Sequence, residues 1–280
     1  MRALAALLLA CCLCGCTSVF FQPSGTLFAT PGEYGIDYER VEFEAADGTP
    51  LFAWFLPARG PARATVLFLH GNAENISTHF GAVAWMPAAG FNVLTFDYRG
   101  YGASQGRPTL AGVQLDIDAA LQTLLARPDV DPQRIVIFGQ SLGGALAIYY
   151  VAHSKERKYV RAVVADSAFS DYRLITEEKL AATPITWPFQ WLPRFTVDDD
   201  YSPQAAVKAL SPIPFLLIAG DEDQIVPPEH SKRLYAIAAE PKEIWIVPGA
   251  GHIQALKQRA MRERLAAFLR RQVQAVPGSF

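Results

Sequence analysis

The segment RIVIFGQSLGGALAIYY, residues 134–150, constrains the fold more than any other part of this chain. Its β-branched and aliphatic first half predicts a buried strand, and its second half predicts a helix rich in small residues. Between them lies Gly139-Gln140-Ser141-Leu142-Gly143, a G-x-S-x-G turn. A serine at such a turn projects its hydroxyl at the head of the helix, where the helix dipole favours developing negative charge. The segment therefore predicts an α/β architecture with Ser141 as a nucleophile.

Short apolar runs alternate with helix-like segments along most of the chain. Eight runs have the length and composition of strands: RVEFEA, LFAWFLPA, ATVLFLHG, FNVLTFDY, RIVIFG, VRAVVADS, PFLLIAG and EIWIVPG. The first two alternate with polar residues, as half-buried antiparallel strands do, and the later runs are continuously apolar, as strands covered on both faces are. This order predicts an α/β fold with a mainly parallel eight-stranded sheet flanked by helices.

The N-terminus predicts secretion and a lipid anchor. Met1-Arg2 precedes an apolar run and all four cysteines of the chain, Cys11, Cys12, Cys14 and Cys16. The run is shorter than the roughly 20 residues of a membrane-spanning helix and is typical of a signal peptide. LCGC resembles the lipobox of bacterial lipoproteins, which predicts a signal peptide over residues 1–15 and lipid on Cys16, with Cys11 as a weaker candidate.

Four cysteines within six residues are poorly spaced for tetrahedral coordination, so we predict no metal site there. We expect the protein in the cell envelope, facing the periplasm or the exterior, and on the outer membrane where the cell has one. A polar, turn-rich tether is expected over residues 16–37 and one globular domain over residues 38–275. The chain has 280 residues, 51% of them hydrophobic, and a formal net charge of −2, which argues against nucleic-acid binding.

A serine nucleophile needs a base, and the base needs an orienting carboxylate. His252 is the candidate base, because it follows a strand in a glycine-rich loop, late in the chain. The other histidines fit less well: His70 is expected to be a packed structural residue, and His79, His153 and His230 fall in helix-like segments expected to be solvated. For the acid, Asp223 best matches a G-x-x-D-x-x-V-P arrangement, Asp221 is the alternative, and Asp166 is a third candidate.

An oxyanion hole needs two backbone N–H groups that point at the tetrahedral intermediate. One is expected from Leu142, the residue after the nucleophile. The other is expected from the loop that follows TVLFLHGNAEN, with Asn72 as the candidate and Ala73 as the alternative.

Taken together, these motifs resemble the α/β-hydrolase superfamily. FLHGNAEN, FDYRGYGASQGRPT, RIVIFGQSLGGALAI, DSAFSD and GDEDQIVP, in that order, are similar to the serine-aminopeptidase-like branch of single-domain acyl hydrolases. The resemblance covers residues 38–269. It implies that Ser141, Asp223 and His252 form a catalytic triad, that Asn72 and Leu142 form the oxyanion hole, and that Arg99 is structural.

Residues 171–201 lie between the sixth and seventh predicted strands, where folds of this kind insert a cap. TPITWPFQWLPRF places Trp187, Phe189, Trp191 and Phe195 close together. One interpretation is a cap that buries its aromatic side chains on the domain. The other is a lid whose Trp187, Phe189 and Trp191 bind substrate or lie in a membrane interface.

The sequence therefore predicts a membrane-anchored serine hydrolase that cleaves an ester or thioester with an apolar acyl group. A serine aminopeptidase or amidase is the alternative, followed by a non-catalytic scaffold and an acyltransferase. The expected partners are a small-molecule or lipid acyl substrate and, through the N-terminal lipid, a membrane. No cofactor, no metal and no obligate protein partner is expected.

Overall fold

The computed structural model describes residues 20–274 of the chain. The predicted signal peptide, the candidate lipidation sites Cys11 and Cys16, and the first part of the predicted tether lie outside these residues. Within residues 20–274, no helix combines the length and the apolar composition needed to cross a bilayer.

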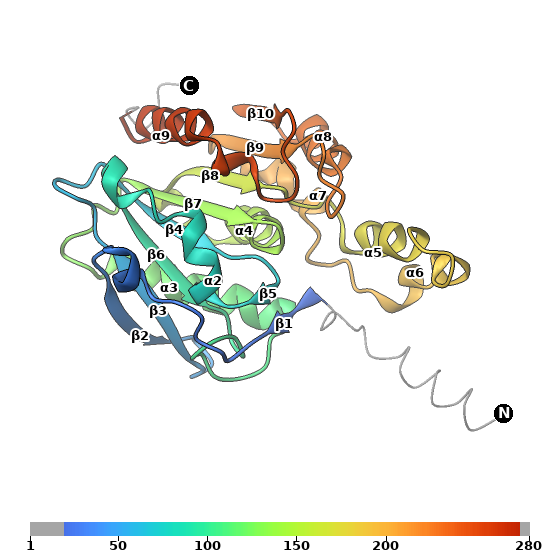
Figure 1. Cartoon of the computed structure of the whole chain (residues 1–280), viewed down its shortest axis with the longest axis horizontal. Helices are drawn as coiled ribbons and strands as arrows, with labels where there is room; N and C mark the ends of the chain where they lie inside the picture. The colour runs from blue at the N-terminus through green and yellow to red at the C-terminus, as the bar shows by residue number, and fades with distance from the viewer. Residues whose placement is uncertain (1–19, 275–280) are drawn as a thin grey trace.

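An eight-stranded sheet forms the centre of the domain (Figure 1). Its strands are β2 (Glu39–Glu44), β3 (Pro50–Leu56), β4 (Ala64–Leu69), β6 (Phe91–Asp97), β7 (Ile135–Gln140), β8 (Val160–Asp166), β9 (Phe215–Gly220) and β10 (Lys242–Val247). They lie in the order β10-β9-β8-β7-β4-β6-β3-β2. Only the β2–β3 and β3–β6 pairs are antiparallel, so the predicted mainly parallel eight-stranded sheet is confirmed.

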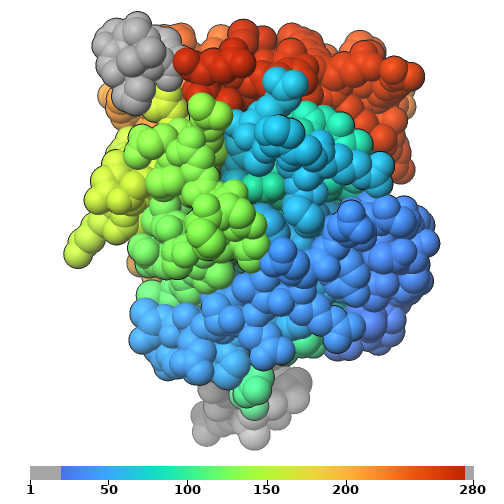
Figure 2. All heavy atoms as spheres, turned by 90° about the vertical axis from the view of Figure 1, so that its left-hand side faces the viewer, coloured from blue at the N-terminus to red at the C-terminus, as the bar shows by residue number. Residues whose placement is uncertain are grey.

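Two hydrophobic cores cover the two faces of this sheet. Along β4, Leu67 belongs to one core, while its neighbours Val66 and Phe68 belong to the other, because successive side chains of a strand point to opposite faces. Helices α3 (Leu110–Leu125), α4 (Leu142–His153) and α8 (Pro228–Ile237) contribute to the first core. Helices α2 (Ile76–His79) and α9 (Arg259–Gln274) contribute to the second. Figure 2 shows the C-terminal residues in red and the N-terminal residues in blue at opposite ends of one side of this domain.

Residues 20–37 pack on the domain, which corrects the tether expected over residues 16–37. Phe21 is 5% exposed, and β1 (Gln22–Pro23) pairs in parallel with β5 (Ala73–Glu74). The side-chain Nδ2 group of Asn75 donates to the backbone carbonyls at residues 24 and 26, at 2.8 and 2.7 Å. Composition indicated an exposed segment, but these hydrogen bonds do not depend on apolar side chains.

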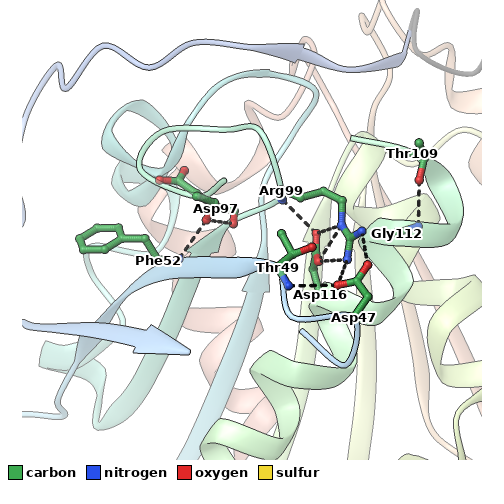
Figure 3. A network of polar contacts seen from close by, with 9 residues as sticks. Asp47, Thr49, Phe52, Asp97, Arg99, Thr109, Gly112 and Asp116 are labelled. Carbon is green, nitrogen blue, oxygen red and sulfur yellow. Dashed lines mark hydrogen bonds and ion pairs between the residues drawn. The ribbon is translucent and has the colours of Figure 1, made fainter. Parts of the chain in front are cut away.

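The loop after β6 is held by a partly buried ion-pair network (Figure 3). The Nη2 group of Arg99 donates to Asp116 Oδ1 of α3 at 2.7 Å, and its Nη1 group donates to Asp47 Oδ2 at 2.7 Å. Asp116 is fully buried and also accepts the backbone N–H of Arg99 at 2.9 Å. Arg99 therefore joins three segments of the chain, in agreement with the structural role expected from the sequence.

The insertion between β8 and β9 contains α5 (Tyr172–Ala181), a 3-10 helix at Trp187–Phe189 and α6 (Pro193–Thr196). Figure 1 shows α5 and α6 projecting from the body of the domain. The short helix α7 (Pro203–Ala206) then leads back towards β9.

Candidate active site

The turn from β7 into α4 places Ser141 in a conformation that few side chains adopt. Its φ is 53° and its ψ −118°, and its backbone N–H donates to the Asp166 carbonyl at 2.8 Å. The glycines on either side leave no room for a side chain. A Cβ on Gly139 would lie 2.1 Å from the Gly143 oxygen, and one on Gly143 would lie 2.1 Å from the Leu69 oxygen. Because surrounding contacts hold this positive φ, the strain marks Ser141 as a functional candidate.

Three sequence-predicted residues come together at the carboxyl ends of the parallel strands. The Nε2 atom of His252, in the loop after β10, lies 3.0 Å from Ser141 Oγ. Its Nδ1 atom lies 2.8 Å from Asp223 Oδ2, in the loop after β9. The imidazole therefore contacts a hydroxyl on one side and a carboxylate on the other, as a general base held by an orienting acid does.

Hydrogen bonds hold the Asp223 carboxylate in its charged form. Burial raises the pKa of this carboxyl, but hydrogen bonds from His252 and from the Val226 and Ile225 amides outweigh burial and lower it. These amides donate to Oδ1 at 2.8 and 2.9 Å. An ionised Asp223 favours a proton on Nδ1 of His252 and leaves the lone pair of Nε2 facing Ser141.

The two alternative acids are placed elsewhere. Asp221 is exposed, and its Oδ1 accepts the Gly249 N–H at 2.7 Å. Asp166 is fully buried, and its Oδ2 accepts the side-chain amide of Gln140 at 2.8 Å. Burial raises the pKa of Asp166 to about 6. Only Asp223, of the three candidates, hydrogen-bonds the His252 ring in this structure.

Leu142 and Asn72 line one cavity with Ser141 and His252. Leu142 is the first residue of α4, and the first N–H groups of a helix have no acceptor within that helix. The Asn72 carbonyl accepts hydrogen bonds from the Gln22 N–H at 2.9 Å and from the hydroxyl of Tyr101 at 2.6 Å. These contacts fix the backbone of the loop after β4, from which the second oxyanion donor was expected.

The cavity has a volume of about 370 Å³ and is mostly apolar. Its lining residues are Phe20, Gln22, Asn72, Ser141, Leu142, Phe169, Ile175, Thr176, Lys179, Ile225, Val226 and His252. The lining contains no carboxylate, and Lys179 is its only Lys or Arg side chain.

The predicted lid residues Trp187, Phe189 and Trp191 do not line this cavity, which corrects the expectation that they bind substrate there. Their side chains are 53–58% exposed on the outer part of the insertion. The insertion contributes instead through α5, with Ile175, Thr176 and Lys179. No pattern in the sequence singled out these three residues, since α5 is neither strongly apolar nor marked by a motif.

A second Ser–His contact lies outside the cavity. The Nδ1 atom of His230 accepts the Ser170 N–H at 3.1 Å and lies 2.9 Å from Ser170 Oγ. Its Nε2 atom lies 2.9 Å from Glu178 Oε2, and Arg233 donates to Ser170 Oγ at 3.2 Å. Both Ser170 and His230 are fully buried, so this cluster joins α8 to α5, and the expectation of a solvated His230 was wrong.

His70 behaves as predicted, because it is fully buried and its Nδ1 lies 2.7 Å from the Gly71 carbonyl oxygen. Among residues 20–274, no group of three or more His, Cys, Asp or Glu side chains has an arrangement that could hold a metal ion.

A Ser–His–Asp contact chain at the carboxyl edge of this eight-stranded sheet is the architecture of the α/β-hydrolases, and the protein is a serine-hydrolase-like member of that class. The superfamily expected from the sequence is therefore confirmed. Within it, residues 78–275 match the sequence model of the prolyl oligopeptidase family, and the chain belongs to that family.

Relatives and solved structures agree with this assignment. The uncharacterized protein YfhR of Escherichia coli K12 is 40% identical over 238 residues, which cover 82% of this chain and 80% of YfhR. The protein Bem46 of Schizosaccharomyces pombe is 31% identical over 231 residues, covering 81% of this chain and 74% of Bem46. The structure of the esterase Pf2001 of Pyrococcus furiosus matches with a TM-score of 0.69 at 26% identity, over 89% of this chain and 99% of that one.

Proposed function

We propose that the protein is a serine hydrolase that cleaves a carboxylic ester or thioester with an apolar acyl group. The observation that carries this proposal is the contact chain from Asp223 through His252 to Ser141, which opens into a mostly apolar cavity. The esterase Pf2001 is a structural neighbour of this chain, which supports ester cleavage.

In the proposed reaction, Ser141 Oγ attacks the acyl carbon while His252 Nε2 takes the hydroxyl proton. Asp223 holds the ring and stabilises the imidazolium that forms. The Leu142 and Asn72 N–H groups bind the oxyanion of the tetrahedral intermediate. Its collapse leaves the acyl group on Ser141, and the alcohol or thiol departs with the proton from His252. Water, deprotonated by His252, then releases the carboxylic acid and restores the serine hydroxyl.

The runner-up is the aminopeptidase or amidase activity expected from the resemblance to the serine-aminopeptidase-like branch. Membership of the prolyl oligopeptidase family supports it. An aminopeptidase needs an anion that binds the substrate ammonium group, and the residues that line the cavity include no carboxylate. The positive charge of Lys179 at the cavity also disfavours a cationic substrate. The cavity chemistry therefore favours the ester.

Fluorophosphonate labelling of the full chain tests the nucleophile. We expect labelling of the wild type and of Ser170→Ala, and none of Ser141→Ala. Labelling that survives Ser141→Ala would refute this nucleophile, and a wild type that does not label would favour a scaffold. A panel of p-nitrophenyl esters, acyl thioesters and aminoacyl amides then tests the substrate class. Turnover of the aminoacyl amides alone would favour the runner-up, and transfer to an added alcohol in preference to water would indicate an acyltransferase.

We also propose that lipid on Cys16 anchors the enzyme in the cell envelope, at the outer membrane where the cell has one. The support is the LCGC motif after a signal-like apolar run. A metabolic palmitate label should be lost in Cys16→Ala and retained in Cys11→Ala. The opposite pattern would move the anchor to Cys11.

A further inference from the structure

The outer part of the insertion exposes a concentration of large apolar side chains. This apolar surface consists of Ile185, Trp187, Phe189, Trp191 and Phe195, with exposed fractions of 85, 58, 53, 53 and 75%. The Trp191 and Phe195 rings contact each other edge to face, with centroids 6.2 Å apart. Soluble proteins rarely leave so many apolar side chains together in water, and such a surface is typical of a site that binds a partner.

The chemistry of this surface suits a lipid bilayer. Residues 180–197 contain no acidic side chain, and Arg194 is their only charged residue. The indole N–H of Trp191 donates to the Pro188 carbonyl at 2.9 Å, so that polar group already has a partner. Tryptophan and phenylalanine favour the boundary between lipid headgroups and acyl chains, where an arginine can reach the phosphates.

The course of the N-terminal chain selects the bilayer over other apolar partners. The ring of Phe20, the first described residue, packs edge to face on Tyr172 of α5, with centroids 4.8 Å apart. The chain therefore meets the domain at the base of the insertion. The apolar run at residues 3–10 and Cys16 come shortly before. Phe20 is four positions after Cys16, and an extended chain spans at most about 14 Å over that distance. A membrane-bound N-terminus therefore keeps the insertion close to the same membrane.

We propose that residues 185–195 dock on a phospholipid bilayer and hold the mouth of the cavity towards it. Phe20 lines that cavity at the N-terminal end of the described chain, and α5 lines it with Ile175 and Thr176. The apolar surface follows directly after α5. Docking thus gives an apolar acyl substrate in the bilayer a short route to Ser141. The choice of a bilayer rests on the proposed N-terminal anchor but not on the proposed reaction, so docking and catalysis can fail separately.

Quenching of tryptophan fluorescence by brominated lipid tests the docking on the full chain. The protein is reconstituted in vesicles of phosphatidylcholine with brominated acyl chains, and its emission is compared with that in unbrominated vesicles. Trp54 and Trp245 are buried and should stay unquenched. Trp187→Phe/Trp191→Phe keeps the surface aromatic but removes its fluorophores, so the quenched fraction should fall by at least half. Trp85→Phe, a matched loss outside the insertion, should not lower it.

Equal quenching in the wild type and in Trp187→Phe/Trp191→Phe would overturn the proposal, because the quenched tryptophan would then lie elsewhere. A bound but unquenched wild type would overturn it as well.

A charge variant separates lipid from a second copy of the chain. Ile185→Glu/Phe195→Glu keeps both tryptophans and should reduce lipid quenching at an unchanged thermal midpoint, whereas Leu115→Glu, an exposed position on α3, should not reduce it. A dimer in sedimentation that dissociates in Ile185→Glu/Phe195→Glu, together with no lipid quenching of the wild type, would assign the surface to self-association and overturn the proposal.

Discussion

Asp223 presents one carboxylate oxygen to His252 and the other to its own backbone. Its Oδ2 lies 2.8 Å from Nδ1 of the ring, while its Oδ1 accepts the N–H groups of Ile225 and Val226. The orientation of the carboxylate is therefore fixed by the loop after β9, independently of the imidazole. The Asp223 carboxylate therefore cannot rotate freely, and its hydrogen bond to Nδ1 keeps Nε2 of His252 facing Ser141.

Asp223→Asn should lower kcat by about 10³–10⁴-fold, because an amide at this position favours the wrong tautomer of His252. The matched control is Asp221→Asn, two residues away, where the carboxylate accepts the Gly249 N–H and does not contact the ring. Steady-state hydrolysis of a p-nitrophenyl ester measures both. A larger loss in Asp221→Asn than in Asp223→Asn would contradict the assignment.

Asp166 should make the fold less stable as pH rises from about 4 to about 6. Burial raises its pKa from the ordinary value of 3.8 to about 6 in the folded protein. Between these values the folded state holds a proton that the unfolded chain has lost, so the free energy of unfolding falls with rising pH and levels off above about pH 6. The shift corresponds to at most about 3 kcal/mol.

Urea unfolding at pH 4 and pH 7 tests this dependence. Asp166→Asn should show a smaller fall in unfolding free energy between the two pH values than the wild type. Asp97→Asn should also show a smaller fall in unfolding free energy than the wild type, because burial raises the pKa of Asp97 to about 6 as well. If the unfolding free energy of both variants fell as much as that of the wild type between pH 4 and pH 7, these carboxyls would not cause the pH dependence.

Glu178→Ala should destabilise the protein and weaken substrate binding. Nδ1 of His230 accepts the Ser170 N–H, so the proton of the ring is on Nε2. The Glu178 carboxylate is the acceptor for this Nε2–H group. A buried donor without an acceptor costs about 1–3 kcal/mol. Because α5 lines the cavity, KM should rise, while kcat should change little since Ser141 and His252 lie on other elements.

The neighbouring Glu177→Ala is the control for this change. Glu177 pairs with Arg194, whose side chain is 68% exposed, so its loss should cost less than about 1 kcal/mol. Thermal unfolding and the kcat and KM values of both variants test whether Glu178→Ala has the larger effect. Equal changes in stability and KM in the two variants would show that the contact between Glu178 and His230 contributes no more than the surface ion pair.

Gly143→Ala should lower stability by at least about 2 kcal/mol, because its Cβ would meet the Leu69 carbonyl at 2.1 Å and neither backbone can move cheaply. Gly81→Ala is the contrast, since a Cβ at that position meets no atom within 4 Å. Thermal unfolding of the two variants should differ clearly. A Gly143→Ala protein with the wild-type midpoint would show that the turn from β7 into α4 can relax.

The sequence was sufficient for the parts of the site that local chemistry dictates. A strand, two glycines and a small-residue helix specify the turn that carries Ser141, and this pattern is contiguous in the chain. The position of His252 followed from its place in a loop after a strand. Asp223 and Asp221 could not be separated with certainty, because both follow the same strand and only the path of the loop decides which carboxylate reaches the ring.

The walls of the cavity depended on contacts that leave no local pattern. Phe20 and Gln22 lie in a polar, turn-rich segment, and they reach the cavity through backbone pairing of β1 with β5. The aromatic residues of the insertion were recognised, but hydrophobicity alone does not say whether a ring faces the domain or its surroundings. Trp187 and Trp191 face outwards because α5, and not the segment after it, packs against the cavity.

The pairing of β1 with β5 has a practical consequence for producing this protein. A recombinant form shortened to the first strand of the large sheet, at residue 39, would keep every strand of that sheet. It would lack the part of the cavity wall formed by Phe20 and Gln22, and the Gln22 backbone N–H that donates to the Asn72 carbonyl. Such a protein would be expected to fold and yet to give misleading substrate preferences, so residues 20–38 belong in any form used for enzymology.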